Sequence, residues 1–380
     1  MADLLDYLDW RGDIPFSTDP FNYVDALILA ELAYVDFAGI VPGPENGDGA
    51  HPYVSIDTVA QEFWKRHTPE EIERSEVLFR RAPLLLKKLC SGVRFGGMYL
   101  AGYTNRISAQ KNEQMAALVF YLEDGSAYAA FRGTDDTVIG WKEDFSFSFR
   151  KETSGQTSAA QYLSEVFGKS DLQRIRVGGH SKGGNLAVYA GVRASYRTRR
   201  KILEIYNHDG PGFYDLNGLG DAYEEMLPRI HSFVPETAVV GLLLEQVGEH
   251  NVVKSNNKGL MQHDAMSWEV LGPEFVTVTG VSDTSRMVND ILKNWLKEIS
   301  NEERATFVDT VYKILDASQA KSIDDLNAEK GRIANVVLRE LGGLDKETKA
   351  MLGKMLASLV REGNQVIKSN MNSNKLKNKK

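Results

Sequence analysis

The chain lacks the features that would stabilise an exported protein or carry a protein through a membrane. Cys90 is the only cysteine among 380 residues, so no intrachain disulfide can form, which is typical of a reducing compartment. No run of about 18 uninterrupted apolar residues occurs, so no transmembrane helix is predicted. The opening residues, MADLLD, are acidic and lack the basic start and long apolar core of a signal peptide. We therefore expect a cytoplasmic protein.

The chain also lacks an excess of basic residues. Lys and Arg number 45 against 52 Asp and Glu, a formal net charge of −7, so no basic field would attract nucleic acid. A hydrophobic content of 42% and a charged content of 26% are ordinary for a globular protein. The end of the chain, 368–380, is rich in Lys, Asn and Ser, which predicts a disordered basic tail. Transient contact of this tail with an anionic membrane surface is a weaker alternative.

The most informative segment is 177–187, VGGHSKGGNLA, which contains Gly179-x-Ser181-x-Gly183. An apolar predicted strand precedes the pattern, and a predicted helix rich in small residues follows from Lys182 to about Arg197. In this setting the pattern is typical of a nucleophile elbow, a tight turn that exposes a strained serine at a helix N-terminus. The alternative is an ordinary glycine-rich helix start capped by Ser181. We favour the elbow because its required strand and helix are both present.

Predicted strands and helices alternate through the middle of the chain. An apolar run at 114–122, an Asp124-Gly125 turn and a second run at 126–131 predict a hairpin. After it, predicted strands at 174–178, 201–207 and 229–234 alternate with helices at 159–167, 182–197 and 219–227, and a further strand is expected at 275–279. This alternation predicts an α/β fold with a mostly parallel, doubly wound sheet.

A serine nucleophile needs a histidine base, and four histidines follow Ser181. In elbow-containing sheets the base lies in a loop beyond the last strands, which favours His263. His250 is the second choice, and His208 and His231 come too early, at strand edges. His180 lies inside the elbow, where it cannot act on its own neighbour.

The base needs an orienting carboxylate from the end of a strand between the serine and the histidine. Glu236 follows the predicted strand 229–234, and Asp209 follows the strand before it. We favour Glu236, with Asp209 as the alternative acid. The structural alternative for Glu236 is that its negative charge stabilises the N-terminus of the predicted helix that follows it. Asp264 adjoins His263, so its side chain should point elsewhere.

Acyl transfer also requires two N–H donors for the developing oxyanion. One is the backbone N–H of Lys182, the residue after the serine. The other is expected from Thr134, because residues 130–136, AFRGTDD, leave a predicted strand and turn at a glycine.

Several segments together resemble the class 3 (fungal-type) lipases. They are Phe131-Arg132-Gly133-Thr134, Trp141 with Asp144, and the elbow GHSKGG at 179–184, in which Lys182 replaces the usual Leu. More closely, residues 1 to about 330 resemble a bacterial lipase-like family long described as a domain of unknown function. That resemblance rests on LDYLDWRGD at 5–13, VPETAVVG at 234–241 and QHD at 262–264.

The resemblance implies an α/β-hydrolase fold and a serine esterase or lipase that cleaves a carboxylic ester of the acyl or lipid type without a metal or cofactor. In class 3 lipases the acid is usually Asp, so a Glu at 236 departs from the pattern. Residues 1–281 would form the hydrolase domain, with a helical part at 1–112. An amidase, peptidase or acyltransferase with the same triad is an alternative. So is a catalytically silent scaffold that binds a partner through its C-terminal helices.

Two segments are candidates for a lid. Residues 135–156 are aromatic-rich and lie where related lipases place one, although their aromatics fit a core role equally well. Residues 282–367 predict helices only, with apolar residues at helical spacing, among them Leu292, Trp295 and Leu296. We expect these helices to pack on the domain and on one another, with a lid or lipid-facing cap as the alternative.

Overall fold

The computed structural model describes residues 1–44, 53–74, 81–134, 138–246, 248–317 and 330–377. Within these residues eight strands form one sheet in consecutive order, antiparallel from β1 to β4 and parallel from β4 to β8. The strands are β1 (Val54–Ser55), β2 (Tyr99–Ser108), β3 (Glu113–Tyr121), β4 (Ala127–Phe131), β5 (Ile175–His180), β6 (Ile202–His208), β7 (Ile230–Pro235) and β8 (His250–Val253). This mostly parallel sheet with an elbow after β5 is the α/β-hydrolase fold.

The predicted hairpin is confirmed as β3 and β4, paired antiparallel around a turn with Gly125 at φ 73°. Successive residues of β3 alternate between the two faces of the sheet. Leu118 and Phe120 enter one core, whereas Ala117 and Val119 enter the other. Because both faces are buried, the strand is apolar at nearly every position.

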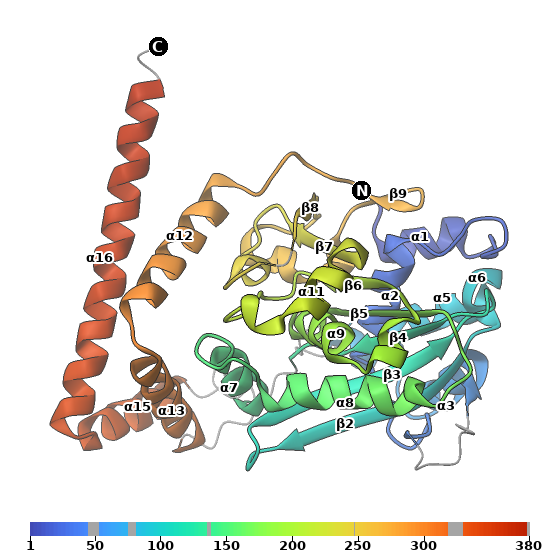
Figure 1. Cartoon of the computed structure of the whole chain (residues 1–380), viewed down its shortest axis with the longest axis horizontal. Coiled ribbons are helices and arrows are strands. Elements are labelled where there is room, and N and C mark those ends of the chain that lie inside the picture. The colour runs from blue at the N-terminus through green and yellow to red at the C-terminus, as the bar shows by residue number, and fades with distance from the viewer. Residues whose placement is uncertain (45–52, 75–80, 135–137, 247, 318–329, 378–380) are drawn as a thin grey trace.

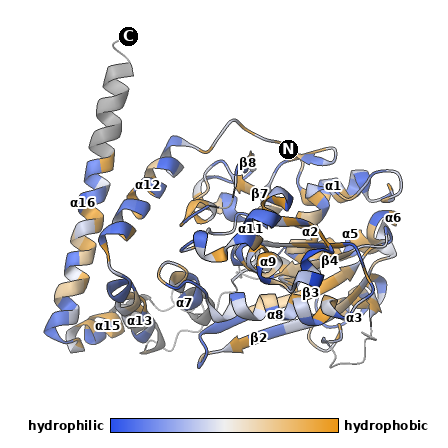
Figure 2. Cartoon of the chain, in the orientation of Figure 1, coloured by the Kyte–Doolittle hydropathy of each residue, from blue (hydrophilic) through white to orange (hydrophobic). Residues whose placement is uncertain are grey.

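Helices from different parts of the chain cover the two faces (Figure 1). One face is covered by helices of the first hundred residues: α1 (Leu4–Arg11), α2 (Tyr23–Leu32), α3 (Ile56–Trp64), α5 (Leu84–Ser91) and α6 (Val93–Gly96). The other is covered by α8 (Ser154–Gly168), α9 (Lys182–Arg193) and α11 (Asp221–Met226). Figure 2 shows apolar residues concentrated in the strands and in α2 and α9, one helix from each of the two layers.

The expectation of a doubly wound sheet was wrong. Strands β4 to β7 follow one another in consecutive order, and the helices that connect them, α8, α9 and α11, all pack on the same face. The N-terminal helices therefore cover the opposite face of the sheet. Strand–helix alternation predicts parallel pairing, but it does not define the order in which the strands pair.

The mostly helical region 1–112 also contains β1 and the ten-residue strand β2, neither of which was predicted from the sequence. The strand expected at 275–279 is shorter than predicted: Glu274–Phe275 form β10, which pairs with β9 (Val270–Leu271), and Thr277 forms only an isolated antiparallel bridge with Val253 of β8. Here Phe275 packs against Trp268 and Phe233, so its apolar character reflects core contacts at a sheet edge.

The C-terminal region forms α12 (Asp283–Glu298), α13 (Asn301–Ala317), α15 (Lys330–Gly343) and α16 (Lys346–Lys377). In Figure 1 these helices stand at one side of the sheet domain, next to α7 (Val138–Ser146). Helix α16 continues to Lys377, whereas composition predicted a disordered tail from 368, and 378–380 lie outside the described residues. None of the described helices combines the length and hydropathy that a membrane span requires.

Candidate active site

Ser181 occupies the turn between β5 and α9 with φ 56° and ψ −133°, a strained conformation for a residue with a side chain. The turn requires glycine on both sides. A Cβ on Gly179 would lie 2.3 Å from the Gly183 backbone, and one on Gly183 would lie 2.0 Å from the Phe131 carbonyl oxygen. The Ser181 N–H donates to the His208 carbonyl at 2.9 Å. The strand–turn–helix setting predicted from the sequence is therefore present.

His263 meets Ser181, as predicted. Its Nε2 lies 3.0 Å from Ser181 Oγ, although the two residues are 82 positions apart. The histidine ends the short 3-10 helix Gly259–His263, which the buried Trp268 holds through an indole N–H to the Gln262 carbonyl at 2.9 Å. The Gln262 side chain accepts from the Thr237 N–H at 2.8 Å and so anchors the loop to the segment after β7.

Asp209, the alternative acid, takes the position next to the base. Its Oδ2 lies 2.6 Å from His263 Nδ1, and its Oδ1 accepts from the Gly241 N–H at 3.0 Å. The carboxyl is 1% exposed; burial raises its pKa above the usual value, and the hydrogen bond with His263 partly offsets that rise. Asp209 directly follows β6, the strand beside the elbow strand, and its φ of 50° turns the side chain out of the strand direction.

The preference for Glu236 is therefore corrected, since the carboxylate on His263 Nδ1 comes from the end of β6 and not from the end of β7. Glu236 acts through its backbone. Its N–H donates to the Val253 carbonyl at 3.0 Å, and its carbonyl accepts from the N–H of Ser282 at 2.7 Å. Ser282 is the N-cap of α12, so Glu236 tethers the start of the C-terminal helices. Each of the two carboxylates follows a predicted strand, as the acid should. Only the position of the loop that carries His263 shows which of them lies beside the histidine.

The two expected oxyanion donors lie next to the serine. Thr134 and Lys182 line the same cavity as Ser181 and His263. A Cβ on Gly133 would lie 3.1 Å from Ser181 Cβ, which places the Gly133–Thr134 turn against the elbow. The Thr134 hydroxyl donates to the Asp144 carboxylate on α7.

The Lys182 side chain does not point into solvent but is 1% exposed in a polar cluster under the elbow. Its ammonium donates to the Gln114 side chain and, at 3.2 Å, to Glu143 Oε2. Glu143 also accepts the N–H groups of Gln114 at 2.9 Å and Gly155 at 2.6 Å. The residue that replaces the usual Leu of class 3 lipases therefore joins α9 to β3, α7 and α8.

His180 contacts both the backbone and the ring of His263, which the sequence did not indicate. Its Nε2 lies 2.9 Å from the His263 carbonyl oxygen, and the two rings are 4.8 Å apart. On the other side its Nδ1 lies 3.1 Å from the Tyr34 hydroxyl and 3.2 Å from Glu31 Oε1, so helix α2 reaches the site. Burial lowers the pKa of His180 well below its usual value and raises that of Glu31 well above it, so burial disfavours the charged form of each group.

The other histidines are elsewhere. His250 lies in β8 and contacts Gln246 at 3.0 Å, and His231 lies 3.5 Å from Glu204. His208 is fully buried among aromatic rings. Asp264 accepts from the Met266 N–H at 3.1 Å and caps the next short helix, as its position beside His263 predicted.

The fold and the site define an α/β-hydrolase in which a strained serine, a histidine and a buried aspartate form one hydrogen-bonded chain. The chain belongs to the Mbeg1-like family, whose model matches residues 89–313, more than half of the sequence. This confirms the resemblance to a lipase-like family seen in the sequence. The match includes Ser181, Asp209 and His263, together with all of α12 and most of α13.

None of the curated proteins matches this sequence significantly. Among solved structures the chain is similar to M37 lipase, with 14% identity over 57% of this chain and 68% of that one and a TM-score of 0.34. It is also similar to a mutant form of MDLA from Penicillium cyclopium. That match has 13% identity over 49% of this chain and 73% of that one, with a TM-score of 0.31.

Proposed function

We propose that this protein is a serine hydrolase that cleaves a carboxylic ester through an acyl-enzyme. The observation that carries the proposal is the unbroken chain from Ser181 Oγ to His263 Nε2 at 3.0 Å and from His263 Nδ1 to Asp209 Oδ2 at 2.6 Å. A nucleophile within hydrogen-bond reach of a base, and a base oriented by a third group, is the arrangement that nucleophilic catalysis requires.

In the first half of the reaction Ser181 Oγ attacks the ester carbonyl carbon while His263 Nε2 takes the hydroxyl proton. Asp209 holds the imidazole in the tautomer that leaves Nε2 free to accept, and its negative charge stabilises the imidazolium that forms. The backbone N–H groups of Thr134 and Lys182 donate to the oxyanion. His263 then returns the proton to the leaving alkoxide, and the alcohol departs.

In the second half a water molecule attacks the acyl-enzyme carbonyl. His263 removes a proton from that water, the carboxylic acid forms, and the proton returns to Ser181 Oγ. The surface around the serine is apolar and suits a hydrocarbon chain on the substrate.

The test is labelling with a fluorophosphonate probe, together with hydrolysis of p-nitrophenyl butyrate. Wild type should label and turn over, and Ser181→Ala should do neither. Ser195→Ala, at a helix N-cap outside the site, is the matched control and should behave as wild type. If folded wild type neither labels nor hydrolyses the ester with or without detergent, the catalytic proposal fails and the binding scaffold takes its place.

A further inference from the structure

A cavity of about 480 Å³ begins at the catalytic serine. Its polar end carries Ser181, His263, Thr134 and Asp144, and its remaining surface is almost entirely apolar. This size is within the range of pockets that bind small organic ligands. The cavity is therefore continuous with the reacting atoms, and its occupant would be bonded to or adjacent to Ser181.

The sheet domain supplies one side of this cavity. Phe145 and Phe147 come from α7 and the turn after it, and Leu243 and Leu244 come from the segment that follows β7. Leu244 has φ 67°, a conformation that costs free energy for a leucine. Two aromatic residues of the lid candidate 135–156 therefore line the cavity that contains Ser181.

The C-terminal helices supply the other side. Leu292, Trp295 and Leu296 of α12 lie at helical spacing along it, and Phe307, Val308 and Val311 of α13 continue the apolar wall. Helix α12 carries both polar and apolar bands (Figure 2), and the apolar band is the one that faces the cavity. Without these helices the apolar surface next to Ser181 would be open to water.

The two helices are fastened to their surroundings by polar contacts. On the sheet-domain side, Lys142 Nζ lies 3.0 Å from Asp309 Oδ1, and the Arg304 guanidinium donates to the Ser148 carbonyl. The same guanidinium donates to the Leu296 carbonyl and so joins α13 to α12.

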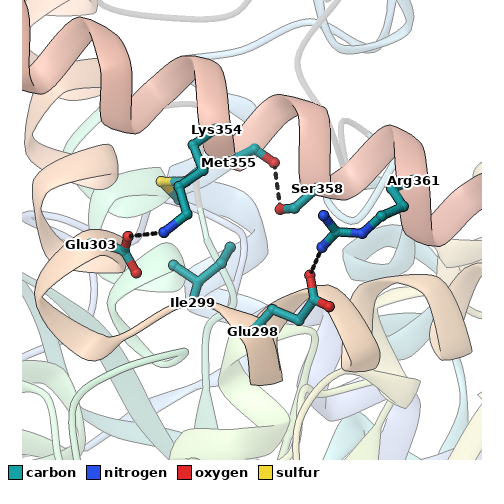
Figure 3. Close-up of a pocket in the computed structure, with 7 residues that line it drawn as sticks. All are labelled: Glu298, Ile299, Glu303, Lys354, Met355, Ser358 and Arg361. Atoms are coloured by element: carbon teal, nitrogen blue, oxygen red, sulfur yellow. Dashed lines mark hydrogen bonds and ion pairs between the residues drawn. The ribbon is translucent and has the colours of Figure 1, made fainter.

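Helix α16 packs behind them (Figure 3). The Trp295 indole N–H donates to the Met355 carbonyl at 3.0 Å. Figure 3 shows the ion pairs Lys354–Glu303 and Arg361–Glu298, which join α16 to the start of α13 and the end of α12. The wall is thus built into the fold by directed contacts.

We propose that helices α12 and α13, backed by α16, form the binding wall for one long hydrocarbon acyl chain of the ester substrate. The inference rests on the proposed function, because the acyl group is the part that stays on Ser181 between the two half-reactions. A chain in this cavity would contact Leu292 and Trp295 on one side and Phe147 and Leu243 on the other. The protein would therefore select esters by acyl length.

The first test is a series of p-nitrophenyl esters from acetate to palmitate on the full chain. The value of kcat/KM should rise by up to about fourfold per methylene until the cavity is full, since burying a methylene contributes about 0.8 kcal/mol. A matched series of alkyl acetates places the hydrocarbon on the alcohol instead. A rise confined to the alkyl acetates, or no rise in either series, would overturn the proposal.

The second test narrows the cavity with a larger side chain in its wall. Leu292→Trp should reduce kcat/KM for the palmitate ester at least tenfold while the acetate ester changes less than threefold. Lys293→Trp adds the same ring to the exposed side of α12 and should leave both esters unchanged. Val311→Phe on α13 provides a second obstruction should Leu292→Trp not fold. Equal loss on both esters, or no loss in either obstructed variant, contradicts an acyl-binding wall.

Palmitate binding to an inactive variant distinguishes the acyl-wall proposal from the hydrolase proposal. Ser181→Ala protein should bind palmitate in a calorimetric titration, and adding Leu292→Trp should weaken that binding at least tenfold. Fluorophosphonate labelling and ester turnover report on the triad alone. Palmitate binding that Leu292→Trp leaves intact would overturn the acyl wall even where labelling supports the hydrolase. Absent labelling with Leu292-dependent palmitate binding would overturn the hydrolase instead.

Discussion

His263 Nδ1 and Asp209 Oδ2 lie 2.6 Å apart, and the carboxylate that makes this contact is 1% exposed. Asp209→Asn should lower kcat for a p-nitrophenyl ester by roughly 10³–10⁴-fold, because an amide stabilises neither the required tautomer nor the imidazolium. Glu236→Gln should stay within about twofold of wild type, since Glu236 contributes backbone hydrogen bonds. The measurement is steady-state kinetics on both variants, and the reverse ranking would return the acid role to Glu236.

The buried ammonium of Lys182 should matter for stability. Lys182→Leu introduces the residue usual in class 3 lipases but leaves Glu143 buried without its cation, so the free energy of unfolding should fall by about 3–5 kcal/mol. Adding Glu143→Gln should recover part of the loss. Lys151→Leu at an exposed position should change stability by less than about 0.5 kcal/mol. Urea denaturation measures all three, and a neutral Lys182→Leu would show that the cluster is not stabilising.

Gly183 and Gly168 make a matched pair of helical glycines. A Cβ on Gly183 would lie 2.0 Å from the Phe131 carbonyl oxygen, whereas a Cβ on Gly168 meets nothing within 4 Å. Gly183→Ala should therefore cost several kcal/mol, on the order of 3 or more, or prevent folding. Gly168→Ala should be neutral or stabilise by up to about 1 kcal/mol. Thermal unfolding of the two proteins compares them, and similar melting temperatures would contradict the close packing of the elbow.

Acid should destabilise the protein through His208. Burial lowers the pKa of His208 to about 3, below its ordinary value of 6.5. Between these values the unfolded chain binds one more proton than the native state, so stability falls as pH falls, by about 1.4 kcal/mol per pH unit. His208→Phe should reduce the loss between pH 6.5 and 4.5 by roughly 2.3 kcal/mol, since the unfolded histidine is already half protonated at pH 6.5.

The aromatic neighbours Phe233 and Trp268 should accommodate that phenyl ring. His231→Phe, at a histidine that is a quarter exposed, serves as the control and should keep the slope due to His208. Denaturant titrations at a series of pH values measure both slopes. An unchanged slope in His208→Phe would mean that His208 is protonated in the folded protein.

The local elements of the site were predictable because each depends on a few neighbouring residues. Glycine at 179 and 183 around a serine predicts a turn that no larger residue could form, and the structure has it. The hairpin at Gly125 follows from turn chemistry in the same way. His263 was found by position after the last strands, a rule about chain order. In contrast, Asp209 and Glu236 end adjacent parallel strands, and local sequence does not say which end the loop of His263 reaches.

The sequence by itself predicted the serine of the elbow, the histidine that lies beside it, both oxyanion candidates, the parallel βαβ units and the helical character of the C-terminal region. These depend on local backbone sterics, hydrophobic periodicity and chain order. Only the tertiary structure decided that Asp209 lies beside His263, that Glu31 of α2 and Tyr34 just after it reach His180, and that α12 and α13 wall the cavity next to Ser181. Each of these joins residues dozens to more than a hundred positions apart. Such contacts are set by the packing of whole layers on one another, which no local pattern encodes.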